Sequence, residues 1–152
     1  MREPSRRAAI ELTPGAIRLD QVREMLHGPI QVRLTPGWQR KVDSAAEVIR
    51  CKVEAGEVMY GINTGFGLLA RTRIPHDKLE ELQLAIVRSH AAGTGPLLSP
   101  GVVRLVLALK AASLARGYSG VRRLVIERLL DLLNADILPC IPAQGSVGAS
   151  GD

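Results

Sequence analysis

The chain has 152 residues, 46% of them hydrophobic, and is therefore long enough to bury the core of one compact domain spanning 1–152. Aromatic residues make up only 3%, so stacking platforms for nucleic acid are poorly supplied despite a formal net charge of +5. The basic residues are scattered among apolar neighbours, which argues against nucleic-acid binding. A core built from Leu, Ile, Val and Ala favours packed helices.

The cysteines and the apolar runs bear on compartment and metal binding. Cys51 and Cys140 have no second Cys or His at metal-ligand spacing, so we predict neither a disulfide framework nor a metal site, and expect buried or idle thiols. The start of the chain lacks the apolar segment of a signal peptide, and charged residues interrupt even the region 102–114. We therefore expect a cytoplasmic protein without membrane contact.

The first third of the chain predicts a small sheet and two helices. Residues 9–12 and 16–19 flank Thr13-Pro14-Gly15 and indicate a hairpin, with 30–34 as a third strand. Between these strands, Asp20 is expected to cap a short helix that ends at Leu26. A longer helix is expected to begin at Thr35-Pro36 and to stop at Gly56. Its apolar face is formed by Val42, Ala45, Ala46, Ile49 and Val53.

The rest of the chain predicts a loop and three helices. A short apolar run at 58–62 leads into residues 61–67, which contain three glycines and are expected to form a loop. A helix from Pro75 places Leu79, Leu82, Ile86 and His90 on one stripe, so we expect the histidine to point inward. Gly93 and Gly95-Pro96 should end this helix. Further helices are expected over 100–116 and 121–134, and prolines make 137–142 extended. The fold class is mainly α, with a few short strands.

The last residues are small, and by composition alone they are typical of a flexible linker. A phosphate-binding loop is disfavoured because no Gly-Lys-Ser or Gly-Lys-Thr follows. The order Gly145-Ser146-Val147-Gly148-Ala149-Ser150-Gly151-Asp152, reached through Ile141-Pro142, resembles the signature of the aromatic amino acid ammonia-lyases and aminomutases. This resemblance extends over essentially the whole chain.

The resemblance implies a prosthetic group formed by the chain itself, 4-methylidene-imidazol-5-one, from Ala149, Ser150 and Gly151. In the family the glycine nitrogen attacks the alanine carbonyl, and loss of water leaves a methylene that activates the substrate. Glycine permits this close approach because it lacks a β-carbon, and serine supplies the β-hydroxyl that is lost. The role of the aspartate corresponding to Asp152 does not follow from this chemistry.

Two further segments are similar to motifs of the same family. Tyr60-Gly61-Ile62-Asn63-Thr64-Gly65-Phe66-Gly67 resembles the loop whose tyrosine is the catalytic base. A phenol is almost fully protonated at neutral pH, so this role requires help from the surroundings, and the glycines suit a lid. Taken alone, the segment is more typical of a surface hairpin with a half-buried tyrosine.

Ser89-His90-Ala91-Ala92-Gly93 resembles the segment that tunes substrate choice, in the version found in the histidine branch of the family. An imidazole can exchange a hydrogen bond with the imidazole of a substrate, which a phenyl ring cannot offer. By itself a histidine on an apolar stripe is more often a satisfied core residue. Some aminomutases share Arg88-Ser89-His90, so a tyrosine or phenylalanine lyase or aminomutase remains an alternative.

The resemblance implies a larger helical enzyme, a homotetramer with shared active sites, and conversion of L-histidine to ammonia and trans-urocanate without metal or added coenzyme. Tyr60, His90 and Ser150 are the expected catalytic residues, with Ser89 and His90 binding substrate. Family members continue for several hundred residues beyond the tripeptide, so we expect this chain to be inactive alone. The non-enzymatic alternative is a small basic helical module that binds an acidic partner through salt-sensitive contacts.

Overall fold

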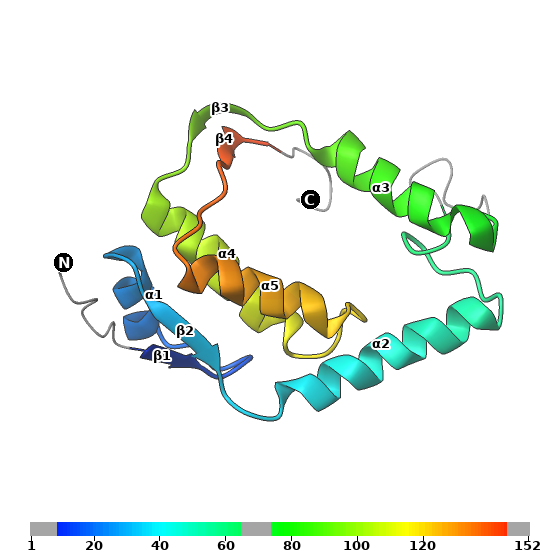
Figure 1. Cartoon of the computed structure of the whole chain (residues 1–152), viewed down its shortest axis with the longest axis horizontal. Helices are drawn as coiled ribbons and strands as arrows, with labels where there is room; N and C mark the ends of the chain where they lie inside the picture. The colour runs from blue at the N-terminus through cyan, green and yellow to red at the C-terminus, as the bar shows by residue number, and fades with distance from the viewer. Residues whose placement is uncertain (1–8, 65–73, 146–152) are drawn as a thin grey trace. The chain divides into compact units, whose positions relative to one another are not determined.

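The computed structural model describes residues 9–64 and 74–145 of the chain (Figure 1). These residues are mostly helical, and the expected fold class is confirmed. Their contacts gather into two compact units. Within the described residues, the first unit comprises 9–48 and 97–141, and the second comprises 49–64, 74–96 and 142–145.

The first unit combines a two-stranded sheet with helices that cover it. Its elements are β1 (Ala9–Leu12), α1 (Leu19–Leu26), β2 (Gln31–Leu34), the first part of α2 (Trp38–Glu54), α4 (Pro100–Leu114) and α5 (Arg123–Asn134). The second unit takes in the end of α2, then the 3-10 turn η2 (His76–Lys78), α3 (Leu79–His90), all but the last residue of β3 (Thr94–Leu97) and β4 (Pro142–Gln144).

The strands of the first unit are parallel, and the predicted hairpin is wrong. β1 pairs with β2 in the register Ala9↔Gln31 to Leu12↔Leu34, while residues 16–18 form no strand and Leu19 already begins α1. Parallel strands require a crossover connection, and α1 lies within that connection. The turn at 13–15 therefore leads into a helix instead of a returning strand.

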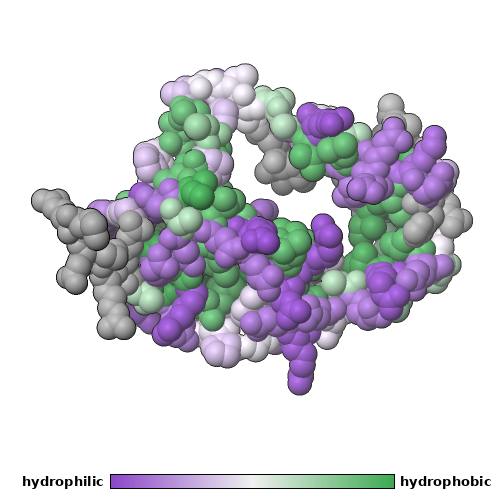
Figure 2. Space-filling view, in the orientation of Figure 1, coloured by the Kyte–Doolittle hydropathy of each residue, from purple (hydrophilic) through white to green (hydrophobic). Residues whose placement is uncertain are grey.

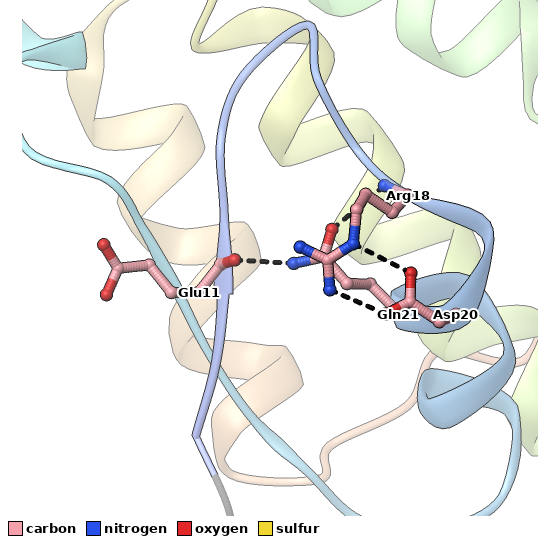
Figure 3. Close-up of polar contacts among 4 residues, drawn as sticks. All are labelled: Glu11, Arg18, Asp20 and Gln21. Atoms are coloured by element: carbon pink, nitrogen blue, oxygen red, sulfur yellow. Dashed lines mark hydrogen bonds and ion pairs between the residues drawn. The ribbon is translucent and has the colours of Figure 1, made fainter.

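The start of α1 is held by Arg18 and not by Asp20, which corrects the predicted cap (Figure 3). The backbone N–H of Arg18 donates to Oε1 of Gln21 at 3.0 Å, and Gln21 Nε2 donates to the carbonyl oxygen of Glu11 in β1 at 2.8 Å. Asp20 lies in the first turn and accepts two hydrogen bonds from the Arg18 guanidinium at 3.0 and 2.6 Å. These bonds lower the pKa of the Asp20 carboxyl.

The core of the first unit lies between the sheet and the helices. Ile10 and Leu12 of β1 and Val32 and Leu34 of β2 face it at alternate positions. Its fully buried large side chains include Leu12, Met25, Val42, Ile126 and Leu133. In Figure 1, α4 and α5 run side by side within this unit, consistent with their extensive packing.

Close backbone approaches and one polar bridge complete the packing of the first unit. A β-carbon on Gly101 would stand 2.6 Å from the Leu26 carbonyl oxygen, so only glycine allows α4 to approach the end of α1. Nearby, Arg104 is 8% exposed, and its Nε donates to Oδ1 of Asp136 at 2.9 Å. Buried charge is therefore paired, as burial requires.

The long helices are confirmed with small shifts at their ends. α2 begins at Trp38 instead of Pro36, and its predicted apolar face carries the buried or half-buried positions 42, 45, 46, 49 and 53. α4 and α5 match their predicted spans to within two residues at each end. β3 is a strand that the sequence did not predict, because Gly95-Pro96 indicates only the end of a helix.

Two further observations concern cysteines and membranes. Cys51 and Cys140 are both exposed and are not joined by a disulfide, so of the two expected states, buried or idle, the buried one is wrong. Among residues 9–64 and 74–145, we find no helix whose length and hydropathy would let it cross a bilayer. The same residues contain no group of three or more His, Cys, Asp or Glu side chains placed to hold a metal ion.

Candidate active site

Tyr60 lies in a turn that is organised by the side chain of Asn63. Asn63 is 4% exposed; its Oδ1 accepts from the backbone N–H of Met59 at 2.7 Å, and its Nδ2 donates to the Glu57 carbonyl at 2.7 Å. The two bonds enclose Tyr60, whose own side chain is 64% exposed. The amide thus fixes the backbone around the tyrosine while leaving most of its side chain accessible to solvent.

Gly61 and Thr64 complete this turn. Gly61 has φ of +74°, a conformation that glycine adopts readily, and its N–H donates to Thr64 Oγ1 at 3.2 Å. Thr64 is fully buried. The prediction of a loop is confirmed for 61–64, whereas Gly65-Phe66-Gly67 lies outside the described residues. The motif therefore encodes a defined turn, with one glycine and two buried polar residues.

Gln83 of α3 attaches this turn to the helix that carries the Ser-His pair. Its Nε2 lies 3.4 Å from the Gly61 carbonyl oxygen and 3.3 Å from that of Ile62, the two residues that follow Tyr60. Sequence reasoning missed Gln83, because its partners lie 21 and 22 positions earlier and no local pattern marks such a contact. The structure thereby links two motifs of the predicted site.

Ser89 and His90 end α3, and both side chains are exposed, so the expectation that His90 points inward is wrong for this chain. The predicted stripe exists, since Leu79, Leu82 and Ile86 are half-buried. However, α3 has no fully buried residue, and all four residues of its last turn, 87–90, are exposed. Figure 2 shows apolar and hydrophilic side chains alternating over α3.

The two side chains form a small hydrogen-bonded cluster on the helix end. Ser89 Oγ donates to the Ile86 carbonyl at 3.0 Å, and His90 Nδ1 lies 2.8 Å from the same oxygen and 3.1 Å from Ser89 Oγ. A carbonyl oxygen only accepts, so the ring hydrogen belongs on Nδ1, and the lone pair of the neutral ring is on Nε2. The ring is oriented by the backbone of its own helix.

β3 and β4 pair and bring the residues after His90 beside the strand that leads to Ala149-Ser150-Gly151. A β-carbon on Gly93 would stand 3.0 Å from Cγ of Pro142, and one on Gly95 would stand 3.0 Å from Cδ of Gln144. Gly95 also has φ of +82°. The glycines that the sequence indicated as a helix end therefore also allow close approach between two strands.

The cofactor-forming residues Ala149, Ser150 and Gly151, and Asp152, lie outside the described residues. Within the second unit the structure brings together the Tyr60 turn and α3 through Gln83, and Ser89 and His90 through their hydrogen bonds. It also places β4, five residues before Ala149, against β3. The Tyr60 turn and the Ser-His pair are thus connected through α3, and β3 pairs with the strand that precedes the third motif in the sequence.

Comparison with known proteins identifies the family. Residues 17–152 match the model of the family described as aromatic amino acid lyase. The chain belongs to the aromatic amino acid lyase family. It is 52% identical over 143 residues to a histidine ammonia-lyase of Burkholderia cenocepacia and 49% identical to one of Desulfotalea psychrophila. These alignments cover 94% of this chain and 28% of each relative, so the chain spans little more than a quarter of their length.

Solved structures of the family share this arrangement. Histidine ammonia-lyase from Trypanosoma cruzi superposes with a TM-score of 0.82 at 33% identity, over 92% of this chain and 27% of that one. Tyrosine aminomutase from Streptomyces globisporus gives a TM-score of 0.85 at 31% identity, over 91% and 26%. The fold is therefore common to branches of the aromatic amino acid lyase family that bear different names, and substrate choice must depend on individual side chains.

Proposed function

We propose that this chain forms part of a histidine ammonia-lyase, which eliminates ammonia from L-histidine to give trans-urocanate. The observation that carries this proposal is Ser89-His90 at the exposed end of α3, in a sequence 52% identical to a curated histidine ammonia-lyase. Similarity to tyrosine aminomutase at 31% identity supports the same fold with weaker sequence agreement. A tyrosine or phenylalanine lyase or aminomutase is therefore the alternative.

Tyr60 is the proposed base that removes the β-proton of the substrate. Its side chain is accessible, while the turn beneath it is held by Asn63 and by Gln83. A base must keep its oxygen within hydrogen-bond reach of the proton that it abstracts. A fixed backbone restricts the positions that the tyrosine oxygen can occupy. The turn supports this role by combining an accessible phenol with an anchored main chain.

His90 is the proposed contact for the imidazole of the substrate, with Ser89 as a supporting contact. The Ile86 carbonyl orients the ring through Nδ1, and an imidazole at this exposed position can pair with an N–H of the substrate ring. Phenylalanine has no ring donor to satisfy it. Selectivity would then follow from the cost of leaving a polar group of the site without its hydrogen bond.

Ala149, Ser150 and Gly151 are proposed to form the 4-methylidene-imidazol-5-one group, whose electrophilic methylene activates the substrate when the group is present. The residue types fit, since the serine carries the β-hydroxyl that must leave and the glycine lacks a β-carbon that would block ring closure. The anchored position of β4 also fits, because closure requires a restrained backbone. Homotetrameric assembly with shared active sites, a cytoplasmic location and independence from metals accompany this proposal.

The proposal is tested by incubating the enzyme that contains this chain with L-histidine, L-tyrosine and L-phenylalanine and identifying the products. We expect urocanate from histidine and little product from the others. Tyr60→Phe should abolish turnover while preserving the fold, and Val58→Ala, an exposed change in the same loop, should not. Turnover restricted to tyrosine or phenylalanine would replace the assignment with the alternative branch.

A further inference from the structure

A polar cavity in the first unit is independent of the residues proposed for catalysis. It has a volume of about 500 Å3 and is formed where three turns meet: 13–15 after β1, 35–38 before and at the start of α2, and 115–118 after α4. Cavities of this size are typical of small-molecule sites. Because β1 and β2 are parallel, the turns that follow them lie at the same end of the sheet, where α/β folds commonly bind ligands.

Two cations line this cavity without acidic neighbours. Lys41 and Arg116 contribute to its wall, and no aspartate or glutamate does so. Across residues 9–64 and 74–145, neither side chain forms an ion pair with a carboxylate. The guanidinium of Arg116 instead lies over the ring of Tyr118, 5.3 Å from its centroid. The site is therefore marked by two cations that line one cavity together, with no carboxylate in its wall to neutralise them.

The backbone keeps these two cations close together. Gly117, next to Arg116, has φ of +79°, and a β-carbon there would stand 2.8 Å from the backbone carbon and oxygen of Lys41. Only glycine permits this contact, so the turn that carries Arg116 rests directly on the helix that carries Lys41. Main-chain packing therefore fixes the positions from which the two side chains extend, which favours a preorganised site.

The hydroxyl groups and ring around the cations indicate what the site would bind. Thr13 and Thr35 line the same cavity and offer neutral donors, while Trp38 provides an apolar wall. Two cations with hydroxyl donors suit a compact anion with several oxygens, because charge-assisted hydrogen bonds to such oxygens are the strongest available. We propose that this cavity binds a small phosphate- or carboxylate-bearing anion, separately from the amino acid substrate.

Trp38 supplies a local reporter for the test, since it is the only tryptophan among the 152 residues and lines the cavity. The enzyme that contains this chain and its Trp38→Phe variant would each be titrated with inorganic phosphate and, separately, with succinate. The difference in fluorescence emission between the two proteins gives the Trp38 signal. Sodium chloride at matched ionic strength corrects for screening. We expect a saturable change in emission with at least one of the two anions. The anion that causes it shows whether the cavity takes a phosphate-bearing or a carboxylate-bearing ligand.

Variants distinguish anion binding in the cavity from anion binding elsewhere on the protein. Lys41→Gln and Arg116→Gln should each weaken binding about tenfold, because each removes one charge-assisted contact. Lys110→Gln, which removes the same charge from an exposed position of α4 outside the cavity, should bind as the parent does. Circular dichroism checks that all variants fold. A response no larger than that to sodium chloride, or one unchanged in both cavity variants, would overturn the proposal.

Discussion

Gly93 and Pro142 lie so close that a β-carbon placed on Gly93 would stand 3.0 Å from Cγ of the proline ring. The first residue follows the Ser-His pair, and the second begins the strand that leads to Ala149-Ser150-Gly151. One strand pairing therefore relates the proposed substrate contact to the proposed cofactor segment, without any direct bond between their side chains.

Gly93→Ala should disturb this pairing, because the added methyl group meets the proline ring at 3.0 Å and the ring must give way by a few tenths of an ångström. We expect a loss of about 1–3 kcal/mol in the free energy of unfolding, as for other overpacked contacts, and reduced formation of the prosthetic group. Urea unfolding and near-ultraviolet absorbance measure the two effects. Gly28→Ala is the matched control, since a β-carbon there meets no atom within 4 Å. Equal behaviour of the two variants would contradict the proposed strain.

The sequence predicts well those elements whose signals are local. Helices α4 and α5 follow from apolar periodicity bounded by Ser99-Pro100 and Gly117, and β2 follows from a short alternating run. The hairpin at 9–19 and the omission of β3 are errors of a different kind. Both depend on partners distant in the chain: β1 pairs with β2, and β3 pairs with residues 142–144. Local turn signals do not report such pairing.

The residues of the candidate site also fall into those that local motifs predict and those that depend on contacts between distant parts of the chain. Tyr60 and Ser89-His90 can be predicted because they belong to motifs, whereas Gln83 cannot, since only the folded chain brings its amide to Gly61 and Ile62. The exposure of His90 also escapes a periodicity argument. Periodicity indicates which side of α3 is apolar, but burial depends on what covers that side.

Asn63→Asp should impair turnover by loosening the turn that carries Tyr60. The carboxylate can still accept from the Met59 N–H, but it cannot donate to the Glu57 carbonyl, and the two oxygens would then repel each other. We expect a stability loss of about 1–3 kcal/mol and a lower kcat. Asn134→Asp is the control, because Asn134 makes a similar pair of bonds to the backbone of Val32 in the first unit. It should lower stability without a comparable fall in kcat per folded enzyme. Equal losses of kcat would argue against a specific role for the Tyr60 turn.

His90→Leu should reduce kcat/KM for L-histidine about tenfold or more, and for L-phenylalanine much less. Leucine removes the ring nitrogen that we propose accepts the N–H of the substrate, and phenylalanine makes no such bond. Val87→Ala, at an exposed position one turn earlier, controls for changes to the helix surface. Steady-state kinetics with both amino acids measure the ratio. A parallel fall for the two substrates would remove the selectivity role of His90.

Asp20 should titrate at a lower pH than an ordinary aspartate, because the hydrogen bonds from Arg18 favour its charged form (Figure 3). A carboxyl whose pKa is lower in the folded state binds protons more weakly there than when unfolded. Its contribution to stability is therefore present above the ordinary aspartate pKa, of about 3.9, and is lost as the pH falls through the lowered value. Side-chain carbonyl NMR measures the titration.

Arg18→Gln should raise the pKa of Asp20 toward its ordinary value, since the guanidinium donors are removed. Arg33→Gln, which removes a nearby arginine paired with Glu11, should leave the titration of Asp20 unchanged. An Asp20 titration that responds equally to both substitutions would indicate general charge effects instead of the specific bidentate contact.

Gly117→Ala should destabilise the protein more than Gly37→Ala, although both positions have positive φ. Alanine at Gly37, with φ of +95°, meets no atom within 4 Å and incurs only the backbone strain, about 1–2 kcal/mol. At Gly117, with φ of +79°, the new β-carbon also meets the Lys41 main chain at 2.8 Å, so the turn must move away from α2. Urea denaturation of both variants measures the difference. If the two lose the same free energy, the turn at 115–118 is free to retreat from Lys41, and the cavity between them is not preorganised.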